Sequence, residues 1–314
     1  MQIINSLNEL NIQDKTSIAL GNFDGLHVGH RKIMEYAINS AKESGLKSLC
    51  FTFSNHPFNF IMQREADDPH AIKLICSEDE KIRLIEEMGF DILVNLPFDE
   101  HIMTMKADDF FNDVMLGKLN AGCVSVGFNY SYGARAGGNA ETLRKECGDA
   151  GIKVNIHDAV RVEDKIVSST LIREMISIGN MELIARYLGR PYAFKGTVTH
   201  GKRLGSAMGI PTVNIPAPSD IMLPPNGVYF SRIIIDGREY KSVSNLGTRP
   251  TVDDKTDKTI ETNIFDYDTH AYGKDVTIYF DHFSRGEVKF ASKEELFSQI
   301  AKDCEKALEY HKKR

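Results

Sequence analysis

Two histidines three residues apart are the first feature of the sequence that could do chemistry. They lie in a glycine-rich turn, Gly21-Asn22-Phe23-Asp24-Gly25-Leu26-His27-Val28-Gly29-His30, between an apolar run and a stretch with helical spacing. The first N–H groups of a helix point outward unpaired, and the helix dipole adds about half a positive charge there. His27 and His30 would share one face of the first helical turn and donate hydrogen bonds to a triphosphate. This segment, the 21–30 turn, is therefore a candidate phosphate site.

The 21–30 turn has three other interpretations: a metal site, a dinucleotide-binding turn and a plain turn. A metal site lacks a third ligand at helical spacing. The dinucleotide-binding pattern GxGxxG is absent. A plain glycine-rich turn with two solvent-exposed histidines is the remaining alternative.

A second group of possible phosphate ligands lies at residues 168–173. Ser168, Ser169 and Thr170 open a predicted helix, and Arg173 follows one turn later. Hydroxyls, free N–H groups and a guanidinium would converge there. Together with the histidine turn they favour a second phosphate clamp. The alternative is a Ser/Thr helix cap with a surface arginine.

A third group of residues that could bind phosphate or its metal ion lies in the last 120 or so residues of the chain. Residues 196–203 nearly match the P-loop spacing, but Arg203 replaces the hydroxyl that binds magnesium and a strand surrounds it, so a P-loop is excluded. The glycine-rich stretch 205–214 ends in Thr212 and Asn214, which share one face of an extended strand. Two neutral oxygens would suit Mg²⁺ together with ATP phosphates and water. The alternative is an ordinary turn and strand.

The elements that must position these groups change character along the chain. Up to residue 187, short apolar runs alternate with amphipathic stretches, which is typical of βαβ units with a parallel sheet. From 194 to 280, short β-rich segments separated by turn signals predict an antiparallel sheet or small barrel. A capping-box pattern at Ser292 predicts a closing helix, whose apolar stripe would be Leu296, Ile300, Cys304 and Leu308. We therefore expect two domains, 1–187 and 188–314.

Composition narrows the class of protein. The chain has 314 residues, 42% apolar and 26% charged, enough for two hydrophobic cores. A net charge of −6 argues against nucleic acid as the main partner. No apolar run is long enough to span a membrane, and the first residues do not resemble a signal peptide. The five cysteines are widely spaced without a CxxC pair, which is typical of reduced thiols, so we expect a cytoplasmic protein without a membrane partner.

The 21–30 turn resembles the HxGH nucleotidyltransferases, and specifically the adenylyltransferase module of bacterial bifunctional riboflavin kinase/FAD synthetases. Residues 52–57 are similar to that family's TFxPHP segment, with Asn55 where proline is usual. Residues 126–133 resemble its VGx(D/N)FxFG segment, with tyrosines for two phenylalanines. Residues 167–173 resemble its SSTxIR motif. The resemblance implies a Rossmann-like nucleotidyltransferase domain with a parallel sheet.

The second half resembles the kinase module of the same family, an antiparallel β-barrel with a closing helix. Residues 205–214 are similar to the end of its glycine-rich PTAN motif, with Ser206 in place of an arginine. Residues 225–229, 244–251 and 285–290 match further motifs in order. Glu261 falls in a segment similar to ETHI, with Asn263 replacing histidine. The resemblance makes Glu261 the general base of phosphoryl transfer.

The implied function is a bifunctional flavin enzyme: riboflavin and ATP give FMN, and FMN and ATP give FAD and pyrophosphate. ATP is a co-substrate and Mg²⁺ the expected cofactor, with Thr212 and Asn214 as its ligands. The alternatives are one surviving activity or a flavin-binding protein without turnover. The oligomeric state is not indicated. The expected catalytic residues are His27, His30 and Glu261; the expected adenylyltransferase ATP ligands are Gly21, Asn22, Phe23, Asp24, Gly25, His27, His30, Asn129, Ser168, Ser169, Thr170 and Arg173; the expected flavin ligands are Asn55, His56, Pro57 and Arg285; and the expected kinase ATP ligands are Gly201, Lys202, Gly205, Thr212 and Asn214.

Overall fold

The computed structural model describes residues 1–65, 71–199, 212–250, 256–267 and 270–313. The chain divides into two compact units, Met1–Ser169 and Thr170–Arg314. Within the described residues, no helix has the length and apolar character needed to cross a membrane.

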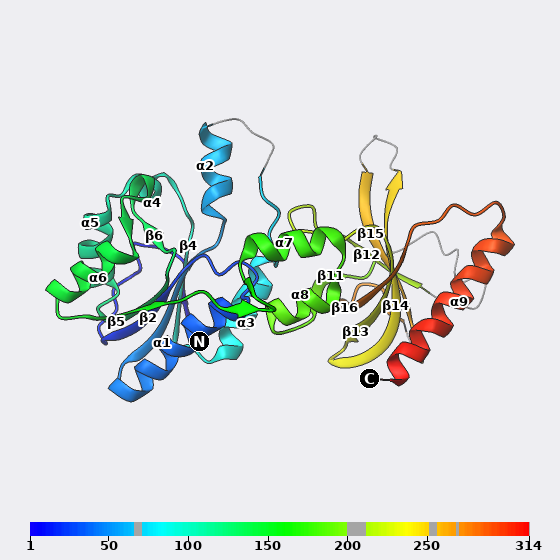
Figure 1. Cartoon of the computed structure of the whole chain (residues 1–314), viewed down its shortest axis with the longest axis horizontal. Coiled ribbons are helices and arrows are strands. Elements are labelled where there is room, and N and C mark those ends of the chain that lie inside the picture. The colour runs from blue at the N-terminus through cyan, green and yellow to red at the C-terminus, as the bar shows by residue number, and fades with distance from the viewer. Residues whose placement is uncertain (66–70, 200–211, 251–255, 268–269, 314) are drawn as a thin grey trace. The chain divides into compact units, whose positions relative to one another are not determined.

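The first unit is built on a six-stranded parallel sheet in the order β1-β4-β3-β2-β5-β8 (Figure 1). The strand order reverses beside β2, and in open α/β sheets ligands bind at the carboxyl ends of the strands at such a switch point. The 21–30 turn follows β2 directly and therefore lies there. The strands are β1 (Gln2–Ile4), β2 (Thr16–Leu20), β3 (Lys47–Phe53), β4 (Ile92–Leu96), β5 (Ala121–Gly127) and β8 (Lys153–His157).

Helices cover both faces of this sheet, because successive strand residues point to opposite sides. Ala19 and Cys50 pack on one face with α1 (Val28–Ser44) and α3 (Glu78–Met88). Their neighbours Ile18 and Phe51 pack on the other face with the π-helical segment η1 and with α6. The remaining elements of this unit are α2 (Pro57–Glu65), α4 (Glu100–Thr104), α5 (Ala107–Asp109), η1 (Phe110–Lys118), β6 (Ser131–Tyr132), η2 (Ala134–Ala136), β7 (Gly138–Asn139), α6 (Ala140–Asp149), β9 (Arg161–Val162) and β10 (Lys165–Ile166).

Local sequence signals set several helix ends as expected. Gly45 ends α1 in the left-handed conformation, with φ of 65°. The Ser77 hydroxyl accepts a hydrogen bond from the Glu80 N–H at 3.3 Å and begins α3. The short helix α5 is continued directly by the π-helical η1.

The second unit begins with two helices and continues into a six-stranded antiparallel sheet in the order β11-β16-β13-β14-β15-β12 (Figure 1). Just after β11, the Thr199 N–H donates to the Asn214 carbonyl of β12 at 2.7 Å, so the two edges of the sheet meet there. The predicted parallel-sheet domain followed by an antiparallel barrel is confirmed. The elements are α7 (Ser169–Ile178), α8 (Met181–Leu188), β11 (Tyr192–Thr197), β12 (Thr212–Pro216), β13 (Gly227–Ile235), β14 (Arg238–Pro250), β15 (Thr256–Ile264), β16 (Asp275–Gly286) and α9 (Lys293–Lys312).

The closing helix α9 is present, and Leu296, Ile300 and Cys304 of its apolar stripe are half-buried. Its buried residues are Asp303, Ala307 and His311, whereas Leu308 is 38% exposed. The polar pair can be buried because each finds a partner on the sheet: Asp303 binds Arg285, and His311 Nε2 lies 3.3 Å from the Ser242 carbonyl oxygen.

Candidate active sites

The 21–30 turn has an unusual backbone that only a rigid surrounding can hold. Phe23 and Leu26 have positive φ angles of 50° and 38°, although neither is glycine. Both side chains are fully buried, and that burial offsets the strain. At Gly25, with φ of 78°, an added Cβ would lie 2.7 Å from Ile75 Cγ2. Glycine at position 25 is therefore required on two counts.

Three hydrogen bonds from distant parts of the first unit fix the turn. The Thr52 hydroxyl donates to the Asn22 carbonyl at 3.0 Å. The Ile75 N–H donates to Asp24 Oδ1 at 2.9 Å. The Ser169 hydroxyl donates to the Asp24 carbonyl at 3.1 Å. The structure thus brings the predicted Ser168–Ser169 segment to the 21–30 turn, and Thr170 and Arg173 follow along α7.

The two histidines form a stacked pair at the start of α1. Their ring centroids are 3.5 Å apart with an interplanar angle of 19°. His27 is the N-cap residue, and its Nδ1 accepts the His30 N–H at 3.2 Å. An accepting Nδ1 leaves the proton of a neutral imidazole on Nε2, so a neutral His27 carries its one N–H at Nε2.

His30 is held in its neutral form. Burial of the ring, together with the neighbouring His27, keeps the pKa of His30 well below its ordinary value. Its Nδ1 is buried and has no hydrogen-bond partner among the described residues. His30 therefore supplies hydrogen bonds rather than a positive charge at neutral pH.

The predicted Asn129 lies on the far side of β2 from β3, at the end of β5. A Cβ added to Gly127 would lie 3.3 Å from Asn129 Oδ1 and 3.5 Å from Ile33 Cδ1 of α1. Asn129 therefore folds back toward the start of α1. The sheet thus brings it to the same carboxyl edge as the histidine pair.

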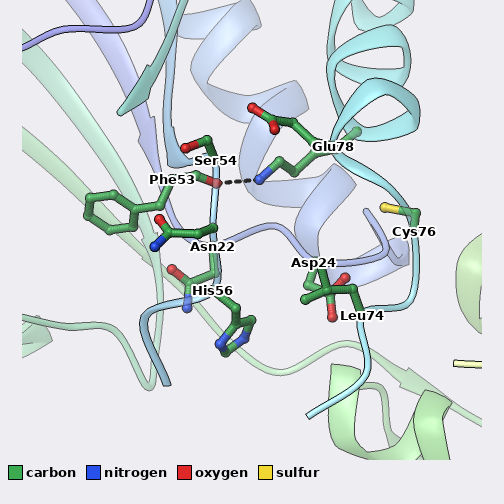
Figure 2. A pocket seen from close by; sticks show the side chains of 10 residues that line it. Asn22, Asp24, Phe53, Ser54, His56, Leu74, Cys76 and Glu78 are labelled. Carbon is green, nitrogen blue, oxygen red and sulfur yellow. Dashed lines mark hydrogen bonds between the residues drawn. The ribbon is translucent and has the colours of Figure 1, made fainter. Parts of the chain in front are cut away.

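On the β3 side of the turn a pocket opens next to Asn22 and Asp24 (Figure 2). Lys81 of α3 lines the pocket, is only 7% exposed, and its Nζ donates to the Phe53 carbonyl at 2.5 Å. Burial lowers the pKa of Lys81, while nearby thiol and carboxyl groups act in the opposite direction. The residues that line the pocket are Asn22, Asp24, Phe53, Ser54, Asn55, His56, Leu74, Cys76, Glu78 and Lys81.

The expected flavin ligands of the first unit lie in or beside this pocket. The Asn55 amide exchanges two hydrogen bonds with the Phe98 backbone, at 3.0 and 2.7 Å. Asparagine here thus ties the loop in place by hydrogen bonds that a proline side chain could not form. His56 Nδ1 accepts the Phe58 N–H at 3.2 Å, and Pro57 is the first residue of α2, where its missing N–H costs nothing.

In the second unit, strand register aligns the expected kinase residues. Asn214 of β12 is opposite Glu261 of β15, and Glu261 is opposite Asn245 of β14. Residues directly opposite in a sheet share a face, so one row carries an amide, a carboxylate and a second amide. Thr212 shares the face with Asn214 and lies opposite Asn263. Gly201, Lys202, Gly205 and the departure at Ser206 lie outside the described residues.

Arg285 belongs to the same row, opposite Val228 of β13. Its Nη2 donates to Asp303 Oδ2 at 2.6 Å and its Nε lies 3.1 Å from Asp303 Oδ1, so the guanidinium holds α9 to the sheet. The expected contact between Arg285 and the flavin stays a prediction. The guanidinium group that would make it is already paired with Asp303.

Two residues outside the predicted set lie at these sites. Asn245 belongs to the segment 244–251, which resembles a kinase-module motif. Only the β14–β15 register shows that Asn245 lies opposite Glu261. Lys81 lies in the first turn of α3, and a lysine is normally exposed. Its burial depends on the packing of α3 against β3, for which the sequence holds no local signal.

A glycine-rich turn with a histidine pair at the switch point of a parallel sheet, followed by an antiparallel barrel with its own polar row, is typical of an enzyme class with two nucleotide sites. Family models agree: FAD synthetase matches residues 9–171 and riboflavin kinase residues 188–311. The chain belongs to the bifunctional riboflavin kinase/FMN adenylyltransferase family.

Relatives of that name match nearly end to end. The protein of Bacillus subtilis is 34% identical over 301 residues, covering 95% of this chain and 93% of its own length. That of Escherichia coli K12 is 28% identical, covering 96% of each. A crystal structure from Streptococcus pneumoniae, described as a macrolide-efflux protein, has a TM-score of 0.87 and 28% identity, covering 96% of this chain and 97% of that one. The predicted family is confirmed.

Proposed function

We propose that this chain makes both flavin cofactors in sequence: it phosphorylates riboflavin to FMN and then adenylylates FMN to FAD, each with ATP. The observation that supports this most directly is that one chain carries both family modules in order, each with its own polar site. All five cysteines are free thiols and the net charge is −6. Both facts favour a cytoplasmic enzyme that acts on small molecules rather than nucleic acid.

Adenylyl transfer would take place at the 21–30 turn. The FMN phosphate attacks the ATP α-phosphorus and pyrophosphate leaves, and the nucleophile is already anionic, so no general base is required. His27 Nε2–H and the free N–H groups of α1 would donate to the phosphate oxygens as charge develops. Ser168, Ser169 and Arg173 would hold the leaving phosphates. Catalysis would then consist of positioning and charge stabilisation.

Phosphoryl transfer would take place at the row on β12, β15 and β14. The riboflavin 5′-hydroxyl attacks the ATP γ-phosphorus, and Glu261 would accept its proton. Thr212 and Asn214 present a hydroxyl and an amide oxygen on one face, and hard oxygen ligands of this kind fit Mg²⁺. When bound with ATP, Mg²⁺ would neutralise phosphate charge.

We propose residues 1–187 and 188–314 as the two functional modules, and the helices between them allow a test. The compact units divide at Ser169/Thr170, and α8 buries Ile184, Tyr187 and Leu188 in the second unit. A fragment 170–314 should therefore phosphorylate riboflavin. A fragment 188–314 lacks Ile184 and Tyr187 and should be less stable in thermal unfolding. Equal stability of the two fragments would show that α8 adds nothing to the kinase module.

Chromatography of riboflavin incubated with the full chain, ATP and Mg²⁺ tests the proposed function. FMN should appear first and FAD later. One ATP should be consumed for each FMN formed, and a second ATP for each FMN converted to FAD. FMN without FAD would leave only the kinase. FAD from supplied FMN, but no FMN from riboflavin, would leave only the adenylyltransferase. A flavin that binds unchanged would show a carrier.

A further inference from the structure

Lys81 is an unusual residue for its surroundings. Lysines are rarely buried, yet Lys81 is 7% exposed and lines a pocket of the first unit (Figure 2). An ammonium group has three N–H donors. Within the described part of the chain, its hydrogen bond goes to the Phe53 carbonyl, which uses one of them. Two donors of a buried cation therefore face the pocket without a protein acceptor.

The nearby carboxylates are engaged by other groups. Asp24 Oδ1 accepts the Ile75 N–H at 2.9 Å, and Glu78 Oε1 accepts the Asn95 amide at 2.7 Å. They lie close enough to favour the charged form of Lys81. The carboxylates that favour the charged form of Lys81 are thus already hydrogen-bonded to other groups, and two N–H donors of the ammonium group remain for a ligand.

The position of the pocket indicates which ligand. It shares Asn22 and Asp24 with the 21–30 turn and lies on the β3 side of β2, whereas Asn129 lies on the β5 side. Two sides of one turn suit the two substrates of a transfer reaction, with ATP on one and the acceptor on the other. Expected flavin ligands Asn55 and His56 also line this side.

The chemistry of the step requires a cation here. An anionic phosphate must approach the phosphates of ATP to near contact, and their repulsion has to be screened. His30, whose pKa is held well below its ordinary value, cannot supply that charge at neutral pH. A buried ammonium group next to the turn can, and its low-dielectric surroundings make the attraction stronger than in water.

We propose that Lys81 binds the 5′-phosphate of FMN and holds it for attack on the ATP α-phosphorus. This inference rests on the proposed adenylyltransferase function and adds a substrate-binding residue to it. Lys81 takes no part in breaking the bond to pyrophosphate. Its contribution is to the affinity for the phosphorylated flavin.

The test compares K81Q, K81R and K81M in the full chain. Glutamine keeps an N–H donor for the Phe53 carbonyl but removes the charge, arginine keeps the charge, and methionine removes both. The matched control is K47Q, because Lys47 lies at the opposite end of β3 and is 50% exposed. Initial rates of FAD formation from FMN give KM for FMN and for ATP. Inhibition by 5′-deoxyriboflavin, which cannot be phosphorylated, reports on flavin binding without a phosphate.

We expect K81Q to raise KM for FMN about ten- to a hundredfold, the loss of one charged hydrogen bond. KM for ATP and the inhibition constant of 5′-deoxyriboflavin should stay within about twofold, K81R should recover part of the affinity, and K47Q should match the wild type. An unchanged KM for FMN overturns the proposal. An equal loss of affinity for FMN and 5′-deoxyriboflavin also overturns it, because Lys81 would then only shape the pocket.

Thermal unfolding and riboflavin phosphorylation identify variants that fail to fold. If K81M fails to fold and K81Q folds, the KM of K81Q for FMN alone tests the role of Lys81. If the wild type makes no FAD from FMN, the proposed adenylyltransferase function is wrong. If the wild type makes FAD and K81Q has an unchanged KM for FMN, only the proposed role of Lys81 is wrong.

Discussion

His27 has an observed structural task and a proposed chemical one, and substitutions can separate them. Its Nδ1 caps α1 by accepting the His30 N–H, and its Nε2–H is the donor that we propose for phosphate. Asparagine is a good N-cap residue and its Oδ1 can accept the same N–H, but it carries no donor in the place of Nε2. Alanine loses both. H27N and H27A therefore form a matched pair.

The expected magnitudes follow from these contacts. Loss of one transition-state donor costs about 3–4 kcal/mol, or about 10²–10³ in kcat. Loss of an N-cap costs about 1 kcal/mol of stability, which in a unit of this size lowers Tm by about 2–4 °C. Both variants should lose FAD formation to a similar degree, and only H27A should lose stability.

The assays are FAD formation from supplied FMN, FMN formation from riboflavin, and thermal unfolding of the full chain. The kinase rate should stay at the wild-type value in both variants and serves as the internal control. H27N with a near-normal rate of FAD formation would refute the role of Nε2–H. H27A as stable as H27N would refute the capping role of Nδ1.

Three further predictions concern other parts of the two sites. E261Q should lower riboflavin phosphorylation about 10²–10⁴-fold at every Mg²⁺ concentration, whereas T212A, which lacks a metal ligand, should recover part of its activity as Mg²⁺ is raised; a near-normal E261Q rate excludes Glu261 as the base. The pKa of His30 is lower in the folded chain than its unfolded value near 6.5, so the unfolded chain binds more protons between those two pKa values. The contribution of His30 to the free energy of unfolding should therefore be constant above about pH 6.5 and fall as the pH drops below it. Urea titrations of H30Q should show a smaller fall. G25A should destabilise more than G45A, because both have positive φ but only position 25 places the new Cβ 2.7 Å from an isoleucine methyl carbon; equal unfolding midpoints would contradict this packing.

The sequence alone determined the fold class and the segments that carry the chemistry. Those features depend on short-range signals: alternation of apolar runs, glycine-rich turns, capping residues and motif spacing. The start of α1, the Ser77 cap of α3 and the two-domain division into parallel and antiparallel sheets all depend on neighbours within a few residues. The family resemblance then followed from the order of these segments.

The tertiary structure decided how those segments meet and which polar groups are buried. The buried side of α9 is Asp303, Ala307 and His311 rather than its most apolar stripe, because Arg285 and the Ser242 carbonyl neutralise or bind the polar members. The burial of Lys81 depends in the same way on a carbonyl at the end of β3. Partners 18 to 69 residues away supply these contacts, so no local pattern records them. A buried polar side chain is stable only where its partner is brought to it, and that is a property of packing rather than of sequence spacing.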